Sequence, residues 1–218
     1  MPLNPSQIVD QLQADPSFAA GVTAWHTAPA QKAVTSAFPE GIDPRIMSAL
    51  KERGITELYS HQASAIQLAL AGTNVVIVTG TASGKTLCYN LPVLQSIVSD
   101  PSSSALYMFP TKALAQDQLA ELHGLISASG IDIKTFTYDG DTPRDARSAV
   151  RRAGHVVITN PDMLHTGILP HHTNWTRLFE NLRYIITVSY THLRAHDTEA
   201  DVVCRLLLEK KKGGGGGG

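Results

Sequence analysis

The chain has 218 residues, of which 43% are hydrophobic and 17% charged, with a formal net charge of −1. This composition suits one or two folded domains and excludes a disordered or fibrous protein. The near-neutral charge gives no global argument for nucleic-acid binding, so such contacts must come from local patches. Two cysteines are too few for a disulfide framework. We expect a cytoplasmic location, no signal peptide and no membrane-spanning segment.

The first part of the chain carries signals for helix starts. Asn4-Pro5 and Asp15-Pro16 each place a capping side chain before a proline, which favours a helix start. Asp43-Pro44 repeats this signal and predicts a short amphipathic helix over 45–53. A further helix is predicted over 61–70.

Strands and helices alternate in the rest of the chain. Short apolar runs rich in β-branched residues predict strands at 75–78, 105–109, 133–138, 155–159 and 183–186. The first run, Val75–Val78, is expected to be buried on both faces. Helices are predicted at 84–98, 113–127 and 143–152. The alternation indicates an α/β fold with a parallel sheet and helices on both faces, in which ligands bind at the carboxyl ends of the strands.

A loop of small residues follows the first predicted strand. It spans Thr79–Thr86 and reads Thr-Gly-Thr-Ala-Ser-Gly-Lys-Thr. Small residues at a helix start let backbone N–H groups converge on phosphate oxygens. Lys85 would then reach the β- and γ-phosphates of a nucleotide, and the Thr86 hydroxyl would hold Mg²⁺. The strict pattern has glycine where this chain has Thr79, and the alternative is a turn without a ligand.

Three further motifs follow the ends of predicted strands. Pro110–Lys112 opens a helix with a hydroxyl and a lysine, which suit a nucleic-acid phosphate. Gly140 leaves room for the backbone to approach a phosphate. Thr159 offers a hydroxyl to a phosphate, whereas Asn160 or Asp162 equally suits a helix cap. For each motif the alternative is an ordinary turn or helix start.

Two other polar motifs are candidates for a binding site. The amide of Gln62 offers a donor and an acceptor, as an adenine edge requires, although a solvent-facing glutamine is the alternative. His171 and His172 are adjacent, so their side chains point apart, and no third ligand is evident. We therefore predict no metal site at this pair.

Taken together, these motifs occur in the order found in superfamily-two helicases of the DEAD/DEAH-box type, which the chain resembles over about 26–186. They are Tyr59–Gln62, Thr79–Thr86, Pro110–Leu114, Tyr138–Pro143 and Thr159–Leu164. Phe38–Gly41, Leu58–Gln62 and 164–172 look like the bacterial branch with a C-terminal zinc-binding domain, related to RecQ-like repair helicases. The resemblance implies an ATP-dependent helicase with a RecA-like domain, favouring DNA over RNA.

The resemblance also implies a set of site residues. Those for ATP are Gln62, Thr79, Gly80, Thr81, Ala82, Ser83, Gly84, Lys85 and Thr86, with Thr86 also holding Mg²⁺. Those for nucleic acid are Pro110, Thr111, Lys112, Gly140, Thr159, Asn160, Pro161 and Asp162. We expect an incomplete first RecA-like domain at 36–187, preceded by a helical extension at 1–35.

One family motif is absent. In the family, the strand at 183–186 leads into Asp-Glu, in which the Asp holds Mg²⁺ through water and the Glu orients the attacking water. Here Ile186 is followed by Thr187 and Val188. A second RecA-like domain is also missing. We therefore expect this chain to bind ATP weakly and not to hydrolyse it usefully.

Residues 188–218 do not continue the family pattern. A lysine run followed by a glycine run is what translated runs of A and G give, and 188–196 and 203–209 resemble translated sequencing adapter. We exclude this segment from functional interpretation as a non-native tail. The alternative is a genuine helix with a flexible glycine tail.

Two other functions stay open at this point. The first is part of an ATP-driven translocase that does not separate strands, since the motor motifs are shared. The second is a non-catalytic module that binds ATP or nucleic acid, provided that 188–218 is genuine protein.

Overall fold

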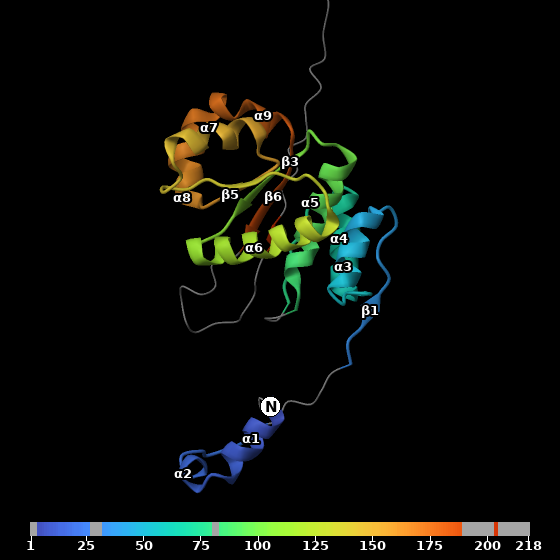
Figure 1. The fold of residues 1–218 in the computed structure, drawn as a ribbon, viewed down its shortest axis with the longest axis vertical. Coiled ribbons are helices and arrows are strands. Elements are labelled where there is room, and N and C mark those ends of the chain that lie inside the picture. The colour runs from blue at the N-terminus through green and yellow to red at the C-terminus, as the bar shows by residue number, and fades with distance from the viewer. Residues whose placement is uncertain (1–3, 27–31, 80–82, 189–202, 205–218) are drawn as a thin grey trace, which may run out of the picture. The chain divides into compact units, whose positions relative to one another are not determined.

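A computed structural model of the chain describes residues 4–26, 32–79, 83–188 and 203–204 (Figure 1). The chain divides into two compact units, Met1–Ala33 and Val34–Gly218. In the described part of the chain, no helix is long and apolar enough to cross a membrane.

The first unit contains two capped helices, α1 (Pro5–Ala14) and α2 (Pro16–Ala19). The side chain of Asn4 accepts a hydrogen bond from the backbone N of Gln7 at 2.8 Å, and Asp15 caps α2 in the same way. The predicted helix starts are therefore confirmed. Neither helix buries a residue, so its caps, and not a hydrophobic core, hold it.

The second unit is built on a sheet with the strand order β4-β5-β3-β6-β7. Its parallel members are β3 (Ser104–Met108), β4 (Thr135–Thr137), β5 (Val156–Thr159) and β6 (Leu182–Val188). They confirm four of the predicted strands. β7 (Val203–Cys204) pairs antiparallel with the end of β6. A separate antiparallel pair joins β1 (Thr35–Ser36) to β2 (Leu58–Tyr59).

Helices cover both faces of the sheet, as predicted (Figure 1). The larger apolar cluster joins one face to α3 (Pro44–Glu52), α4 (Ser60–Leu70), α5 (Lys85–Ser99) and α6 (Lys112–Ser129). The smaller cluster joins the other face to α7 (Arg144–Ala153), the π-helix η1 (Leu164–Ile168), the 3-10 helix η2 (Leu169–Trp175) and α9 (Thr176–Glu180).

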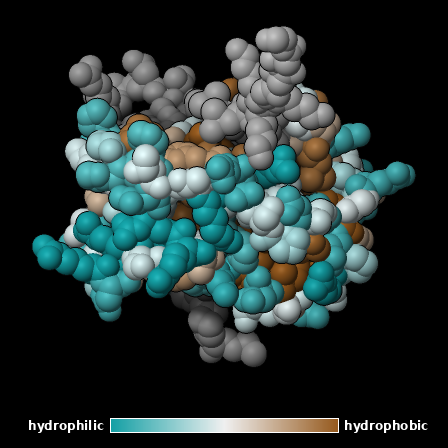
Figure 2. Space-filling view, turned by 90° about the horizontal axis from the view of Figure 1, so that it is seen from above, coloured by the Kyte–Doolittle hydropathy of each residue, from teal (hydrophilic) through white to brown (hydrophobic). Residues whose placement is uncertain are grey.

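Alternation along the strands divides the two clusters. Tyr107 lies in the larger cluster and its neighbour Leu106 in the smaller one, and Ile158 and Val157 divide in the same way. Successive side chains of a strand point to opposite faces, so these apolar runs fill two cores at once. On the face drawn in Figure 2, hydrophilic residues predominate and hydrophobic residues appear as smaller patches.

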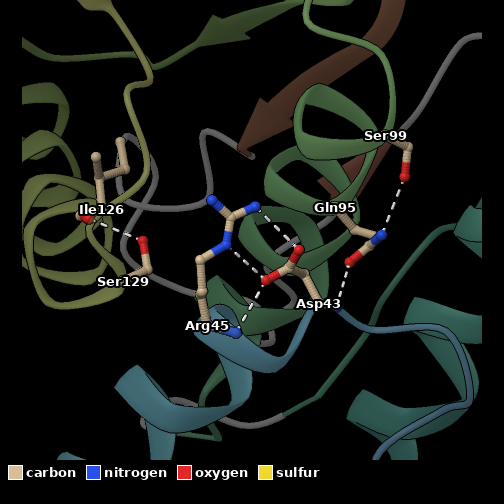
Figure 3. A network of polar contacts seen from close by, with 6 residues as sticks. All are labelled: Asp43, Arg45, Gln95, Ser99, Ile126 and Ser129. Carbon is tan, nitrogen blue, oxygen red and sulfur yellow. Dashed lines mark hydrogen bonds and ion pairs between the residues drawn. The ribbon is translucent and has the colours of Figure 1, made fainter.

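A polar network ties α3 to α5 (Figure 3). Asp43 caps α3 by accepting from the backbone N of Arg45 at 2.9 Å, and it also accepts from the Arg45 guanidinium at 3.0 Å. These bonds lower the pKa of Asp43. The backbone N of Asp43 donates to the side chain of Gln95 on α5 at 2.7 Å. Asp43 therefore stabilises the start of α3 and also links α3 to α5.

The prediction that Val75–Val78 is a strand buried on both faces is wrong. Only Val76 forms a bridge, and Val76 and Val78 are 58% and 62% exposed. An apolar pocket, whose empty space including the part open to solvent is about 290 Å³, is lined by Val75 and Ile77 and, from β6, by Tyr184 and Ile186. This lining places Val75 and Ile77 beside β6, whose end alone pairs with β7, but apart from the bridge at Val76 the segment forms no strand. The composition of this run favours a strand, but a strand forms only where the backbone pairs with a neighbouring strand.

The interpretation of 188–218 as a non-native tail concerns mostly residues 189–202 and 205–218, which lie outside the described residues. Of that segment, Val188 is the last residue of β6 and pairs with Val203.

Candidate functional site

The predicted phosphate loop stands at the start of α5. Gly84 caps this helix with φ of 72°, a left-handed conformation that L side chains rarely adopt. A Cβ at Gly84 would lie 2.5 Å from Nε2 of Gln62. Glycine is therefore required here for both its conformation and its size. Gly80, Thr81 and Ala82 lie outside the described residues.

Lys85 contacts the loop that precedes it. Its Nζ donates to the backbone oxygen of Thr79 at 3.0 Å and lies 3.5 Å from the hydroxyl of Ser83. The hydroxyls of Thr79 and Ser83 are 2.6 Å apart. The lysine is thus directed at the loop that the sequence predicts to cradle a phosphate, and a phosphate would compete with these oxygens for its ammonium.

Gln62 joins α4 to the phosphate loop. Its side chain is almost fully buried, its Oε1 accepts from the backbone N of Tyr59 at 2.9 Å, and its Nε2 donates to the backbone oxygen of Gly84 at 2.8 Å. The neighbouring His61 places Nε2 at 3.1 Å from the backbone oxygen of Ser83. A glutamine amide has two N–H donors and two acceptor lone pairs. One of each is used here, and the amide that would meet a base edge is itself almost fully buried.

Thr86 is hydrogen-bonded to a residue of another helix. Its hydroxyl donates to Oε1 of Gln118 on α6 at 3.1 Å, and the hydroxyl of Tyr89 donates to the same oxygen at 2.5 Å. Because Thr86 donates in this bond, its oxygen keeps its lone pairs. A hydroxyl oxygen with lone pairs to offer is a ligand that Mg²⁺ accepts, so Thr86 fits the predicted metal role.

A second candidate site is a groove at the carboxyl ends of β3, β4 and β5, where parallel strands place their ligands. Its empty space, including the part open to solvent, is about 300 Å³. Its lining residues are Phe109, Thr111, Lys112, Ala115, Gln116, Thr137, Asp139, Ile158, Thr159 and Asn160. The groove therefore brings together Thr111, Lys112, Thr159 and Asn160 from separate predicted motifs.

Thr111 and Lys112 form the start of α6. Thr111 caps the helix, accepting from the backbone N of Leu114 at 3.3 Å. Lys112 is half exposed and makes an ion pair with the exposed side chain of Asp141, in the turn after β4. The hydrogen bond to Asp141 raises the pKa of Lys112. The lysine is therefore charged and at the surface, as a phosphate contact requires.

Thr159 and Asn160 have internal partners. Thr159 is almost fully buried, and its hydroxyl donates to the backbone oxygen of Tyr138 at 2.7 Å. Asn160 caps α8 (Pro161–Met163) by accepting from the backbone N of Met163 at 2.8 Å, the cap that the sequence left as an alternative. Asp162 lies in the first turn of α8. Thr159 and Asn160 therefore both stabilise the local structure, whether or not a ligand is bound.

The turn after β4 is supported by α7. The guanidinium of Arg147 donates to the backbone oxygen of Thr142 at 3.0 Å and lies over the ring of Tyr138, 5.5 Å from its centroid. It also reaches the backbone oxygen of Gly140 at 3.5 Å. A Cβ at Gly140 would meet nothing within 4 Å, so the space beside this glycine is open.

Sequence reasoning missed Gln118, Tyr89 and Arg147, and it gave no role to Asp141, which lies in the motif Tyr138–Pro143. The one available signal was spacing: Gln118 lies seven residues after Thr111, hence on the same face of one helix. Among the residues that the structure describes, no group of three or more His, Cys, Asp or Glu could hold a metal, and His171 and His172 lie in η2.

Comparison with known proteins identifies close relatives. The family described as DEAD/DEAH box helicase matches residues 59–187. An uncharacterized ATP-dependent helicase, YprA of Bacillus subtilis, is 62% identical over 165 residues, which are 76% of this chain and 22% of YprA. The ATP-dependent helicase hrq1 of Schizosaccharomyces pombe is 37% identical over 83% of this chain and 17% of its own length.

A solved structure agrees with these relatives. The crystal structure of the DUF1998 helicase MrfA bound to DNA and AMPPNP shares 56% identity with a TM-score of 0.76, over 85% of this chain and 26% of MrfA. The chain thus spans about a sixth to a quarter of the length of these relatives.

Proposed function

Because the chain belongs to the DEAD/DEAH box helicase family, we propose that it contributes to the first motor domain of an ATP-dependent nucleic-acid helicase. The fold is the RecA-like α/β fold that the sequence predicted. The observation that carries the proposal is the start of α5, where Lys85 reaches back to the loop and Thr86 presents its hydroxyl. Such a loop before a helix is an anion site.

The proposed cofactors are ATP and Mg²⁺. Gln62, Thr79–Thr86 and especially Lys85 would hold ATP, and Thr86 would supply an oxygen ligand to the metal. When bound, Mg²⁺ neutralises phosphate charge and so favours phosphoryl transfer. The structure supports these roles through the donors of Lys85 and the acceptor lone pairs of Thr86.

DNA is the proposed nucleic acid, and DNA repair the proposed process. The MrfA structure is described as bound to DNA, and it shares 56% identity with this chain. In this chain, the groove beside Lys112 and Thr111 would bind backbone phosphates, which position a strand without reading its sequence. Pro110, Gly140, Thr159, Asn160, Pro161 and Asp162 are proposed to border the same path.

We place the ATP-binding domain at 36–187, the helical extension at 1–35 and the non-native tail at 188–218. Cysteine usage supports a cytoplasmic location. Hydrolysis by this chain alone is not expected, because no Asp-Glu pair follows Ile186.

The experiment compares two proteins. In a full-length helicase that contains residues 1–187, single-stranded DNA should stimulate ATP hydrolysis and Lys85→Ala should abolish it. The 218-residue chain should bind ATP without such stimulated hydrolysis. Stimulated ATPase activity of this chain, lost in Lys85→Ala, would overturn the expectation that it is catalytically incomplete.

A further inference from the structure

Gln118 lies outside every motif that the sequence suggested, yet it is the acceptor for the hydroxyl of Thr86. We propose that Gln118 is a positioning residue for Mg²⁺: it holds the hydrogen of the Thr86 hydroxyl, so that the oxygen faces the metal with its lone pairs. The inference rests on the proposed nucleotide site, and it adds Gln118 to the residues that this site requires.

The orientation of the Gln118 amide follows from its neighbours. Its Nε2 faces the carboxylate of Asp117 at 3.5 Å, and a carboxylate accepts but does not donate. Its Oε1 is therefore the atom that faces the hydroxyls of Thr86 and Tyr89. Since an amide oxygen can only accept, both hydroxyls must donate to it.

The direction of this bond matters to the metal. A threonine hydroxyl has one hydrogen and two lone pairs. If another group took the lone pairs, or if the hydrogen pointed at the metal, the oxygen would be a poor ligand. With the hydrogen fixed on Gln118, both lone pairs are available. Residues that orient a ligand in this way typically change metal affinity about 10–100-fold when mutated.

The core holds this arrangement in place. Tyr89 is buried, and its ring packs edge-on against Tyr107 with centroids 5.6 Å apart. The hydroxyl of Tyr107 donates in turn to the side chain of Asn90 at 3.0 Å. Tyr89 therefore approaches Gln118 from a fixed position. An amide that only filled space between α5 and α6 would not need two donors on one oxygen.

The test measures how strongly Mg²⁺ improves nucleotide binding. The affinity of a fluorescent ATP analogue for the 218-residue chain is measured with Mg²⁺ and with EDTA, and the ratio of the two dissociation constants is compared among variants. Gln118→Met keeps the volume but removes the acceptor. Gln118→Glu keeps an acceptor. Gln67→Ala removes an exposed amide from α4 and is the matched control.

We expect Gln118→Met to lower the Mg²⁺-dependent ratio about tenfold while its affinity in EDTA stays near wild type. Gln118→Glu and Gln67→Ala should keep the wild-type ratio. A ratio in Gln118→Met within twofold of wild type would overturn the inference and leave the nucleotide site standing, as would a Glu variant as impaired as the Met variant. A wild-type chain that binds no nucleotide would overturn the proposed site and the inference together.

Discussion

The phosphate loop and the groove at the strand ends hold their candidate residues in different ways. At the loop, Gln62 is buried and bonded to Gly84, and Thr86 is bonded to another helix. In the groove, Lys112 is half exposed and pairs with an exposed carboxylate. The loop is thus tied by hydrogen bonds to residues of α4 and α6, whereas the lysine of the groove is a surface group. Substitutions in the loop should alter folding and binding together, while Lys112 can be changed for binding alone.

The largest effect is expected at Gly84. Gly84→Ala should lower the free energy of unfolding by about 3 kcal/mol, because it combines left-handed strain with a contact to Gln62. Gly54 also has a positive φ, of 79°, but a Cβ there would meet nothing within 4 Å. Gly54→Ala should therefore cost about 1 kcal/mol. Equal losses for the two variants in urea denaturation would mean that the contact with Gln62 carries no cost.

The next effect separates two roles for Thr159. Thr159→Val keeps the shape but leaves the backbone oxygen of Tyr138 without its buried donor, so we expect a loss of about 1–2 kcal/mol in urea unfolding. If Thr159 also touches DNA, the same variant weakens binding of single-stranded DNA at temperatures where it is fully folded. An unchanged stability with weakened binding would show that the internal bond is unimportant.

A smaller effect is expected at Lys112. Lys112→Gln should weaken binding of single-stranded DNA of any sequence several-fold and reduce the magnitude of the salt slope by about 1, as loss of one phosphate contact does. Its stability should change by less than about 0.5 kcal/mol, because exposed ion pairs contribute little. Fluorescence anisotropy between low and moderate salt gives both quantities. An unaltered slope would remove Lys112 from the proposed interface.

The smallest effect is expected at Asp141. Its carboxylate competes with a phosphate for Lys112, so Asp141→Asn should raise affinity for single-stranded DNA about twofold to fivefold at low salt. Asp145→Asn removes the same charge from the exposed first turn of α7 and controls for net charge. In a chain that already carries Lys112→Gln, the gain from Asp141→Asn should fall to that of the control. If the Lys112→Gln chain still gains as much affinity from Asp141→Asn, then Asp141 does not act by competing with phosphate for Lys112.

Local features of the sequence predicted most of the fold. Asn4, Asp15 and Asp43 cap helices as expected, because a cap depends only on neighbouring residues. The apolar runs at β3, β5 and β6 became strands because partners lie beside them. Val75–Val78 has a similar composition, but it forms only a bridge at Val76, and Val76 and Val78 are exposed. Whether such a run forms a strand depends on its pairing with a neighbouring strand, which composition alone does not predict.

The candidate site was likewise predictable where it depends on neighbouring residues, and not where it depends on contacts distant in sequence. Loop composition predicted Gly84, Lys85 and Thr86. The contact of Gln118 with Thr86 joins residues 32 apart in sequence, and it arises only when α5 and α6 pack on the same face of the sheet. Likewise, the internal bond of Thr159 depends on the pairing of β4 with β5. Long-range partners of this kind decide whether a predicted residue is open to a ligand.

The central claim is that the loop before α5 binds a nucleotide through Lys85. The most direct measurement is the equilibrium binding of a fluorescent ATP analogue to the 218-residue chain with Mg²⁺, for wild type and Lys85→Ala, with folding of both checked by circular dichroism. We predict saturable binding that Lys85→Ala weakens about 10-fold to 100-fold, as loss of charge-assisted hydrogen bonds would. No binding by the folded wild-type chain, or equal binding by the folded variant, would contradict the account.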